Sequence, residues 1–327
     1  MIFLLKRETH VKKKRKKIKS IWHPKYWGLH LGFFILKLIA YLPYSFKYQL
    51  GKLIGLLLYY CNKPMRRICE INIQTCFSNK SHEKQTKIIK KSFINLGRSF
   101  TDAMSLAWMR SEKEFDHLLH SVKGEDYINN ALNSGQGVML LFPHLTNMYM
   151  VGYLLLKKLN IPFSIMYHSP RNPVLKKFAQ QRLDKYCEKT FNRKNLKPML
   201  AHLKTGHLVW YAPDLDPGKK NAVFVPFFGV EAATHTATAK IAKATGAAAI
   251  PISFYRRKDK SFDIRFHPPL NNFPSDDPIA DALNINKTLE PIIQKHPEQY
   301  LWQYRRFATV QKGKISIYNL EKGKNKP

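Results

Sequence analysis

His144 combines a chemical type and a position that together indicate chemistry. It follows an apolar run at residues 138–142 that predicts a buried strand, with Gly137 before the run and Pro143 after it. In an open α/β sheet, ligands bind outside the carboxyl ends of the strands, which is where His144 would lie. A neutral imidazole there can take a proton from a hydroxyl group. The alternative interpretation is a histidine that caps the next helix or is hydrogen-bonded in the core.

The elements that would position this side chain alternate between strands and helices. Residues 72–132 have helical periodicity, which is clearest at 83–108. Beyond the His144 strand, the pattern predicts helices at 148–156, 172–186 and 237–244, and strands at 161–167, 208–212, 248–255 and 262–267. Strands that alternate with helices predict an α/β fold with a mixed, mostly parallel central sheet flanked by helices.

Composition limits the classes of protein to be considered. With 327 residues, 44% of them hydrophobic, the chain can bury one large core or two small ones, which excludes wholesale disorder. The formal net charge of +33 indicates a polyanionic partner or surface, such as nucleic acid, an anionic membrane face or an acidic carrier protein. The four cysteines show no metal-binding or disulfide spacing, which favours free thiols in a reducing compartment.

The first 62 residues differ in composition from the rest. Residues 1–20 contain nine Lys or Arg and one acid, so this arm can bind anionic headgroups or nucleic acid, or serve only solubility. Two apolar stretches with aromatic flanks follow, at 28–42 and 50–60. A spanning helix needs about 20 apolar residues, so the first stretch is marginal and the second is too short. We therefore expect a hairpin or an interfacial membrane anchor, with a buried helix of the main domain as the alternative.

Several sequence blocks resemble those of one known family. They are HPKYW at 23–27, WYAPD at 210–214, VFVPFFG at 223–229, residues 234–238 and 246–251, PEQYLW at 297–302 and RRF at 305–307. In these blocks, spread in order over about residues 22–315, the chain is similar to the late acyltransferases of lipid A biosynthesis, the lauroyl and myristoyl transferases. The resemblance implies the acyltransferase fold and an inner-membrane enzyme of a Gram-negative cell. Such an enzyme moves an acyl chain from acyl carrier protein to a hydroxyacyl group of the lipid A precursor.

The resemblance also implies a catalytic base. In the family it is the histidine of an H-x4-D/E motif, and His144 matches that position. The acid of the motif would orient the imidazole and stabilise the imidazolium that forms in the transition state. This sequence has Tyr149 instead of the acid. A tyrosine hydroxyl can still orient the ring, but it carries no negative charge at neutral pH, so a factor of about 10² to 10⁴ in rate is at stake.

Two substrate-binding residues follow from the same resemblance. Asp214 matches the aspartate of the Ala-Pro-Asp turn, and Arg182 is the best match for an arginine in the basic helix. An arginine fork suits a lipid phosphate or the phosphopantetheine of the acyl donor, and an aspartate at a strand end can hold that arginine in place. On spacing alone, a turn-forming residue beside Pro213 is the simpler interpretation of Asp214.

These inferences define one main hypothesis and one alternative. We expect a basic arm at 1–21, a membrane-associated helical region at 22–62, an acyltransferase domain at 63–318 and a basic tail at 319–327. The expected partners are acyl carrier protein, an anionic lipid acceptor and the cytoplasmic face of the bacterial inner membrane, with no nucleic acid and no metal or organic cofactor. The alternative is a catalytically impaired accessory protein of the same fold that binds lipid or carrier protein, because the motif's acid is replaced.

Overall fold

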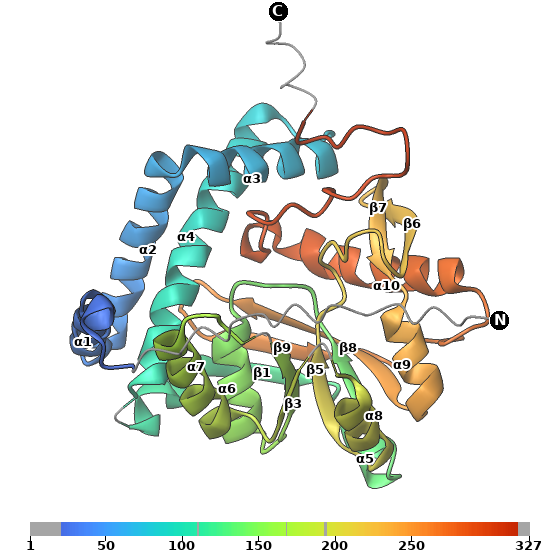
Figure 1. Cartoon of the computed structure of the whole chain (residues 1–327), viewed down its shortest axis with the longest axis horizontal. Helices are drawn as coiled ribbons and strands as arrows, with labels where there is room; N and C mark the ends of the chain where they lie inside the picture. Colours follow the sequence, from blue (N-terminus) through green and yellow to red (C-terminus); the bar gives the residue numbers. More distant parts are fainter. Residues whose placement is uncertain (1–20, 110, 168, 193–194, 320–327) are drawn as a thin grey trace, which may run out of the picture.

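The computed structural model describes residues 21–109, 111–167, 169–192 and 195–319 (Figure 1). Most of the predicted basic arm and tail lies outside the described residues. The α-helices are α1 (Trp27–Ala40), α2 (Tyr44–Cys61), α3 (Lys63–Cys76), α4 (His82–Ala107), α5 (Glu125–Asn133), α6 (Met148–Lys158), α7 (Pro173–Tyr186), α8 (Lys197–Lys204), α9 (Ala237–Thr245) and α10 (Pro278–Lys295). The strands are β1 (Leu119–Lys123), β2 (Val138–Leu141), β3 (Ser164–Tyr167), β4 (Thr190–Asn192), β5 (Leu208–Tyr211), β6 (Ala222–Phe227), β7 (Val230–His235), β8 (Ala248–Arg256) and β9 (Phe262–Phe266).

Within the described ranges, seven strands form the central sheet in the order β1-β9-β8-β2-β5-β3-β4. The strands from β8 to β4 run parallel to one another. β9 is antiparallel to β8, and β1 is parallel to β9, so the sheet is mixed. β6 and β7 form a separate antiparallel hairpin. The predicted class, a mixed and mostly parallel sheet flanked by helices, is confirmed.

The central strand β2 is buried on both faces. Val138 and Leu140 belong to the larger apolar core, which includes residues of α4, α6 and α10. Met139 and Leu141 point to the opposite face and join a smaller core with residues of α8 and α9. A strand covered on both faces is apolar throughout instead of alternating, which explains the unbroken run that predicted it.

α2 packs along α4, and Figure 1 shows the two helices side by side on one flank of the molecule. Glycines permit the close approach of the two backbones. A Cβ atom added to Gly97 would lie 2.1 Å from the carbonyl oxygen of Gly51, and one added to Gly55 would lie 2.3 Å from that of Phe93. Such distances leave no room for a side chain. The inner face of α2 is therefore part of the folded domain.

The outer faces of α1 and α2 expose apolar side chains. On α1 they recur at helical spacing at Leu31, Phe34, Ile35 and Leu38; on α2 they are Phe46, Leu53, Leu57 and Tyr60. Across the described residues, none of the helices combines the length and the apolar character that crossing a membrane requires.

Most predicted elements are present with shifts of a few residues at their ends. The elements that were not predicted include β1, β4, α8, the β6–β7 hairpin and α10. The helical interpretation of residues 72–132 is wrong in part, because β1 lies inside that range. β1 is a half-buried edge strand with polar side chains, so it lacks the apolar run that marked the inner strands.

Candidate active site

Two neighbouring strands bring His144 and Asp214 together. β2 and β5 are adjacent and parallel, and Leu141 pairs with Tyr211 in their register. His144 lies three residues beyond Leu141, and Asp214 lies three residues beyond Tyr211, each directly after a proline. Equal offsets from a paired position place both side chains outside the carboxyl ends of the strands, where open α/β sheets bind ligands.

Asp214 binds His144 through both carboxylate oxygens. Oδ1 lies 2.5 Å from the ring Nδ1, and Oδ2 accepts the backbone N–H of His144 at 2.8 Å. Because an ionised carboxylate only accepts hydrogen bonds, Nδ1 is the donor and the lone pair of the ring is on Nε2. In the part of the chain that the structure describes, no hydrogen bond reaches Nε2, and the ring lines a cavity.

Burial and pairing act in opposite directions on this pair. Asp214 is fully buried, which alone would raise its pKa. The charge of His144, its two hydrogen bonds and a hydrogen bond from the Tyr300 hydroxyl outweigh burial and hold the pKa of Asp214 below its ordinary value. Burial likewise disfavours the imidazolium, but the charge of Asp214 and its hydrogen bond raise the pKa of His144. The carboxylate is thus ionised, and the imidazole is a stronger base than a free histidine.

The loop after His144 is fixed by a segment far along the chain. The carbonyl of His144 accepts the N–H of Leu301 at 3.0 Å, and the N–H of Thr146 donates to the carbonyl of Gln299 at 2.8 Å. The side chain of Asn147, which is buried, donates to Gln299 Oε1 at 2.5 Å. These bonds hold the backbone on both sides of the imidazole and turn Asn147 away from it.

The cavity beside His144 has a volume of about 520 Å³. Its walls come from α4, α6, α7 and the carboxyl ends of β2, β3 and β5, and they are mostly apolar, with Phe142, Met148, Phe163 and Trp210 among the lining residues. Three polar atoms of lining residues are buried without a hydrogen-bond partner in the described structure: the hydroxyls of Tyr153 and Tyr167, and Nε of Arg182. Buried polar atoms without partners are rare, and here they indicate that a ligand or water completes them.

Tyr149 lines the same cavity but does not take the acid's place beside His144. It is the second residue of α6, its side chain is 55% exposed, and no hydrogen bond joins it to the imidazole within the described residues. The carboxylate that orients the ring comes instead from Asp214, on a different strand. Desolvation raises the pKa of Tyr149, so its hydroxyl is neutral at physiological pH.

Arg182 also lines the cavity, from α7. Its guanidinium carbon lies 4.2 Å from the ring centroid of Phe178 and 5.5 Å from that of Trp108, and its Nη1 donates to Gln181 Oε1 at 3.0 Å. Over the residues that the structure describes, no carboxylate pairs with it, and Asp214 does not hold it. The expected Arg182–Asp214 arrangement is therefore not present, because the Asp214 carboxylate is used by His144.

The arrangement can perform acid–base chemistry on a substrate that combines an apolar chain with a hydroxyl group. A base with a raised pKa faces an apolar cavity, and a cation, Arg182, lies in the cavity wall beside aromatic rings. Sequence reasoning missed Tyr300, the hydroxyl partner of Asp214. Its signal was the PEQY block, which had been used only for the resemblance.

Comparisons with known proteins identify the family of this chain. A family model described as bacterial lipid A biosynthesis acyltransferase matches residues 14–309. The lipid A biosynthesis lauroyltransferase of Escherichia coli (strain K12) is 32% identical over 304 residues, which are 91% of this chain and 97% of the relative. The palmitoleoyltransferase of the same organism is 33% identical, over 90% of this chain and 96% of its own length. The myristoyltransferase of that strain is 26% identical, over 92% and 93% of the two chains.

The matches cover nearly the whole described fold and include both β2 and β5 with the residues that follow them. The relatives are named for different acyl groups, so the comparisons agree on the reaction class and not on the chain that is transferred. On these grounds the chain belongs to the bacterial lipid A biosynthesis acyltransferases and is an acyltransferase.

Proposed function

We propose that this enzyme transfers a fatty acyl group from acyl carrier protein to a hydroxyl group of a lipid A precursor, with His144 as the general base. The observation that carries the proposal is the His144–Asp214 pair beside an apolar cavity. A buried carboxylate on Nδ1 fixes the tautomer in which Nε2 can accept a proton. This is the role that the motif's acid was expected to fill, so the tyrosine at position 149 does not imply an inactive protein.

In the proposed reaction, Nε2 of His144 takes the proton of the acceptor hydroxyl. At the same time the oxygen of that hydroxyl attacks the thioester carbonyl of the donor. A C–O bond forms and the C–S bond breaks. The imidazolium then returns the proton to the leaving thiolate, which regenerates the base. Asp214 remains ionised throughout and stabilises the positive charge on the ring.

The cavity suits the acyl chain of the donor, because its walls are apolar and it starts at the catalytic base. Arg182 suits an anionic group of the donor or the acceptor, since an arginine stacked on Phe178 keeps its donors available for a phosphate. Tyr149 suits a contact with the acceptor lipid, because its half-exposed ring borders the same cavity. The net charge of +33 suits an acidic carrier protein and a phosphorylated lipid.

The acceptor is a membrane lipid, and the outer face of α1 and α2 is suited to reach it at the cytoplasmic side of the inner membrane. Trp22 and Trp27 are 68% and 64% exposed beside the apolar rows of Leu31 to Leu38 on α1. Aromatic residues next to an apolar face are typical of interfacial helices, and the basic arm of 1–20 adds attraction to anionic lipids. The proposed geometry is therefore an enzyme that lies on the membrane with these helices in the interface.

Acyl transfer from acylated carrier protein to the lipid A precursor tests the catalytic proposal. His144→Ala should lower the rate by about 10³-fold, because the base is removed. His267→Ala is the matched control, since His267 is a part-buried histidine that hydrogen-bonds Ser253, outside the cavity. Equal rates for wild type and His144→Ala, with both proteins folded, would exclude His144 as the base. Mass spectrometry of lipid A from cells with and without the gene identifies the acyl chain and its position.

Flotation with anionic vesicles tests the membrane proposal. Phe34→Asp combined with Leu38→Asp should reduce the vesicle-bound fraction, because both side chains are exposed on one face of α1. Ile279→Asp, which changes one exposed apolar side chain on the first turn of α10, is the control for each of these two substitutions made singly. Deleting residues 1–20 should weaken binding at low salt and make the remaining binding less sensitive to salt. If all variants float like wild type, this face is not the membrane contact.

A further inference from the structure

A second group of histidine and carboxylate side chains lies at the opposite edge of the central sheet. His207 directly precedes β5, and Glu188 lies two residues before β4. His202 is on α8, and it bonds Ser164, the first residue of β3. The group thus lies at the amino ends of the parallel strands, whereas His144 lies beyond their carboxyl ends.

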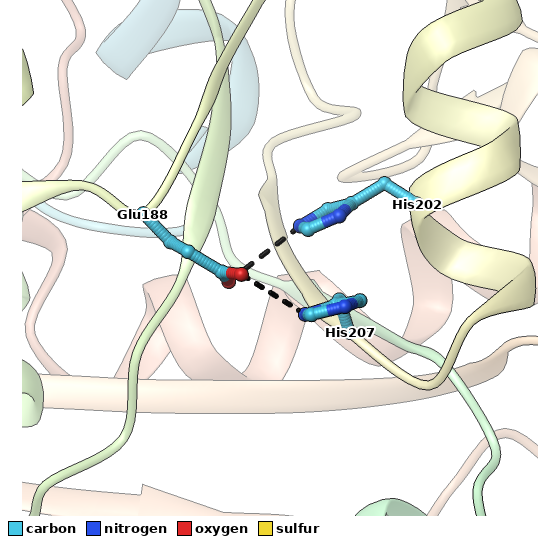
Figure 2. A group of neighbouring side chains, drawn as sticks. All are labelled: Glu188, His202 and His207. Atoms are coloured by element: carbon cyan, nitrogen blue, oxygen red, sulfur yellow. Dashed lines mark ion pairs between the residues drawn. The ribbon is translucent and has the colours of Figure 1, made fainter.

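We propose that Glu188, His202 and His207 bind a zinc ion (Figure 2). One ligand atom of each lies within 4.8 Å of the other two. Two imidazoles and one carboxylate are a ligand set that zinc uses in proteins, and none of the three is needed for the acyl transfer. The proposal does not depend on the proposed reaction.

The distances within the group fit a shared metal. Glu188 Oε1 lies 3.0 Å from Nδ1 of His207, and Glu188 Oε2 lies 3.5 Å from Nε2 of His202. Two ligands of a tetrahedral zinc ion, each about 2.0–2.1 Å from the metal, are separated by about 3.3 Å. Figure 2 shows the carboxylate pointing at both rings from one side. The two rings are stacked, with centroids 3.9 Å apart and 13° between their planes, so they must splay apart for both nitrogens to point at one ion.

Charge also favours a cation at this place. Two protonated imidazoles at stacking distance would repel each other, and one carboxylate balances only one of them. A divalent ion would satisfy the carboxylate and both lone pairs together. Ser164 Oγ lies 2.9 Å from Nε2 of His202, so zinc at that nitrogen would replace this hydrogen bond and leave the Ser164 hydroxyl to bond a water on the metal.

The three residues lie within 20 positions of one another but come from different parts of the fold. A metal would tie the start of β4 to α8 and to the entry of β5. Glu188 follows Cys187, which lines the acyl cavity together with the last turn of α7. The ion would therefore hold the wall of that cavity from the side opposite to the catalytic base. The sequence alone gives no sign of this group, because residues 188, 202 and 207 match no complete zinc motif.

Zinc binding to the full-length, untagged enzyme tests the proposal. After removal of metals with a chelator, calorimetric titration should show one zinc ion per chain, and Co²⁺ should give the strong visible absorption of a four-coordinate site. His207→Asn should weaken zinc binding by at least about 100-fold, since loss of even an outer-shell partner costs 10- to 100-fold. His207 is 39% exposed, so this variant should fold. Glu188→Gln and His202→Asn should weaken binding similarly.

His82→Asn is the matched control, because His82 is an exposed histidine on the first turn of α4. Zinc should raise the melting temperature of wild type and His82→Asn and leave that of His207→Asn unchanged. Acyl transfer by each variant shows that it has folded. The proposal is overturned if wild type binds no zinc, or if His207→Asn and His82→Asn bind it as tightly as wild type.

Discussion

The two edges of the central sheet each join histidine to a carboxylate, but they do so in opposite ways. At the carboxyl edge, Asp214 is fully buried and serves one ring, that of His144, through two hydrogen bonds. At the amino edge, Glu188 is 27% exposed and is shared between His202 and His207. The Asp214 carboxylate also accepts a hydrogen bond from the Tyr300 hydroxyl, so three hydrogen bonds hold it in place.

This difference is the basis for proposing a proton-transfer site at one edge and a metal-binding site at the other. A buried carboxylate that is committed to one ring keeps that ring in a single tautomer and raises its pKa, as a general base requires. A carboxylate shared by two protonated rings cannot neutralise both, whereas one divalent ion can be bound by all three groups once the rings splay apart. The variants below separate the two roles, because each should affect one edge and spare the other.

Removing the charge of Asp214 should have the largest effect. Asp214→Asn should lower acyl transfer by about 10² to 10⁴-fold, because the imidazolium loses its charge partner and the ring loses its tautomer. The dependence of the rate on pH should change as well. Asp214 raises the pKa of His144 above 6.5, so the neutral base is lost as the pH falls through that raised value. Without the charge, the acidic limb of the profile should move to lower pH.

The double variant Asp214→Asn with Tyr149→Glu is the control for this prediction. It restores a carboxylate at the spacing of the H-x4-D/E motif while the buried one is absent. Recovery of most of the lost rate would mean that residue 149 reaches the imidazole, which contradicts the placement of Tyr149 at 55% exposure. No recovery is the expected result.

Tyr300→Phe should have the next largest effect. It removes one hydrogen bond to the Asp214 carboxylate, and a hydrogen bond to a charged group is worth about 1.5–3 kcal/mol. If only part of this energy stabilises the transition state, the rate should fall about tenfold. The turnover number should fall and the KM for either substrate should not. Tyr318→Phe is the control, since its hydroxyl bonds Asn72 instead. A rise in KM with unchanged turnover would mean that Tyr300 acts on binding.

Tyr149→Phe should lower transfer only about two- to threefold. The hydroxyl makes no hydrogen bond to His144, so its loss affects a contact with the acceptor lipid and not the base. The effect should therefore be on the KM for the lipid, measured at saturating acyl donor. A loss as large as that of Asp214→Asn would instead make this hydroxyl part of the proton-transfer chemistry.

Glu188→Gln should have the smallest effect on catalysis. At saturating substrates its transfer rate should stay within about twofold of wild type, because Glu188 contacts none of the reacting groups. Its loss should appear in zinc affinity and in melting temperature. The alternative outcome is that folded, zinc-depleted wild type and Glu188→Gln both lose most of their transfer rate. Zinc binding would then affect catalysis through the wall of the cavity.

The sequence predicted those strands that are buried on both faces and therefore form unbroken apolar runs. The apolar runs before His144 and Asp214 identified β2 and β5, and the alternation of elements gave the class of fold. The position of His144 at a strand end followed from that alone. β1 and the β6–β7 hairpin were missed because neither is an apolar run covered on both faces.

The partner of His144 was the harder part of the site. Motif spacing directed attention to Tyr149, five residues along the chain, although the acid lies 70 residues away on the neighbouring strand. The sequence did contain an indication of this pairing, because each of the two apolar runs is followed by a proline and then by His144 or Asp214. Using it required the knowledge that β2 and β5 are adjacent and in register, and pairing of parallel strands is not local information. The Glu188 group gave no signal for a different reason, because its residues match no complete zinc motif.

The hydrogen bonds from Gln299 and Leu301 to the His144 loop have a consequence for the synthesis of the protein chain itself. Their hydrogen bonds span more than 150 residues, and the ribosome makes the loop long before its partners emerge. Contacts of such high sequence separation form late in folding. A nascent chain therefore cannot fix the backbone on both sides of His144 until residues 299–301 have been made. Acyl transfer should begin only after translation has passed residue 301.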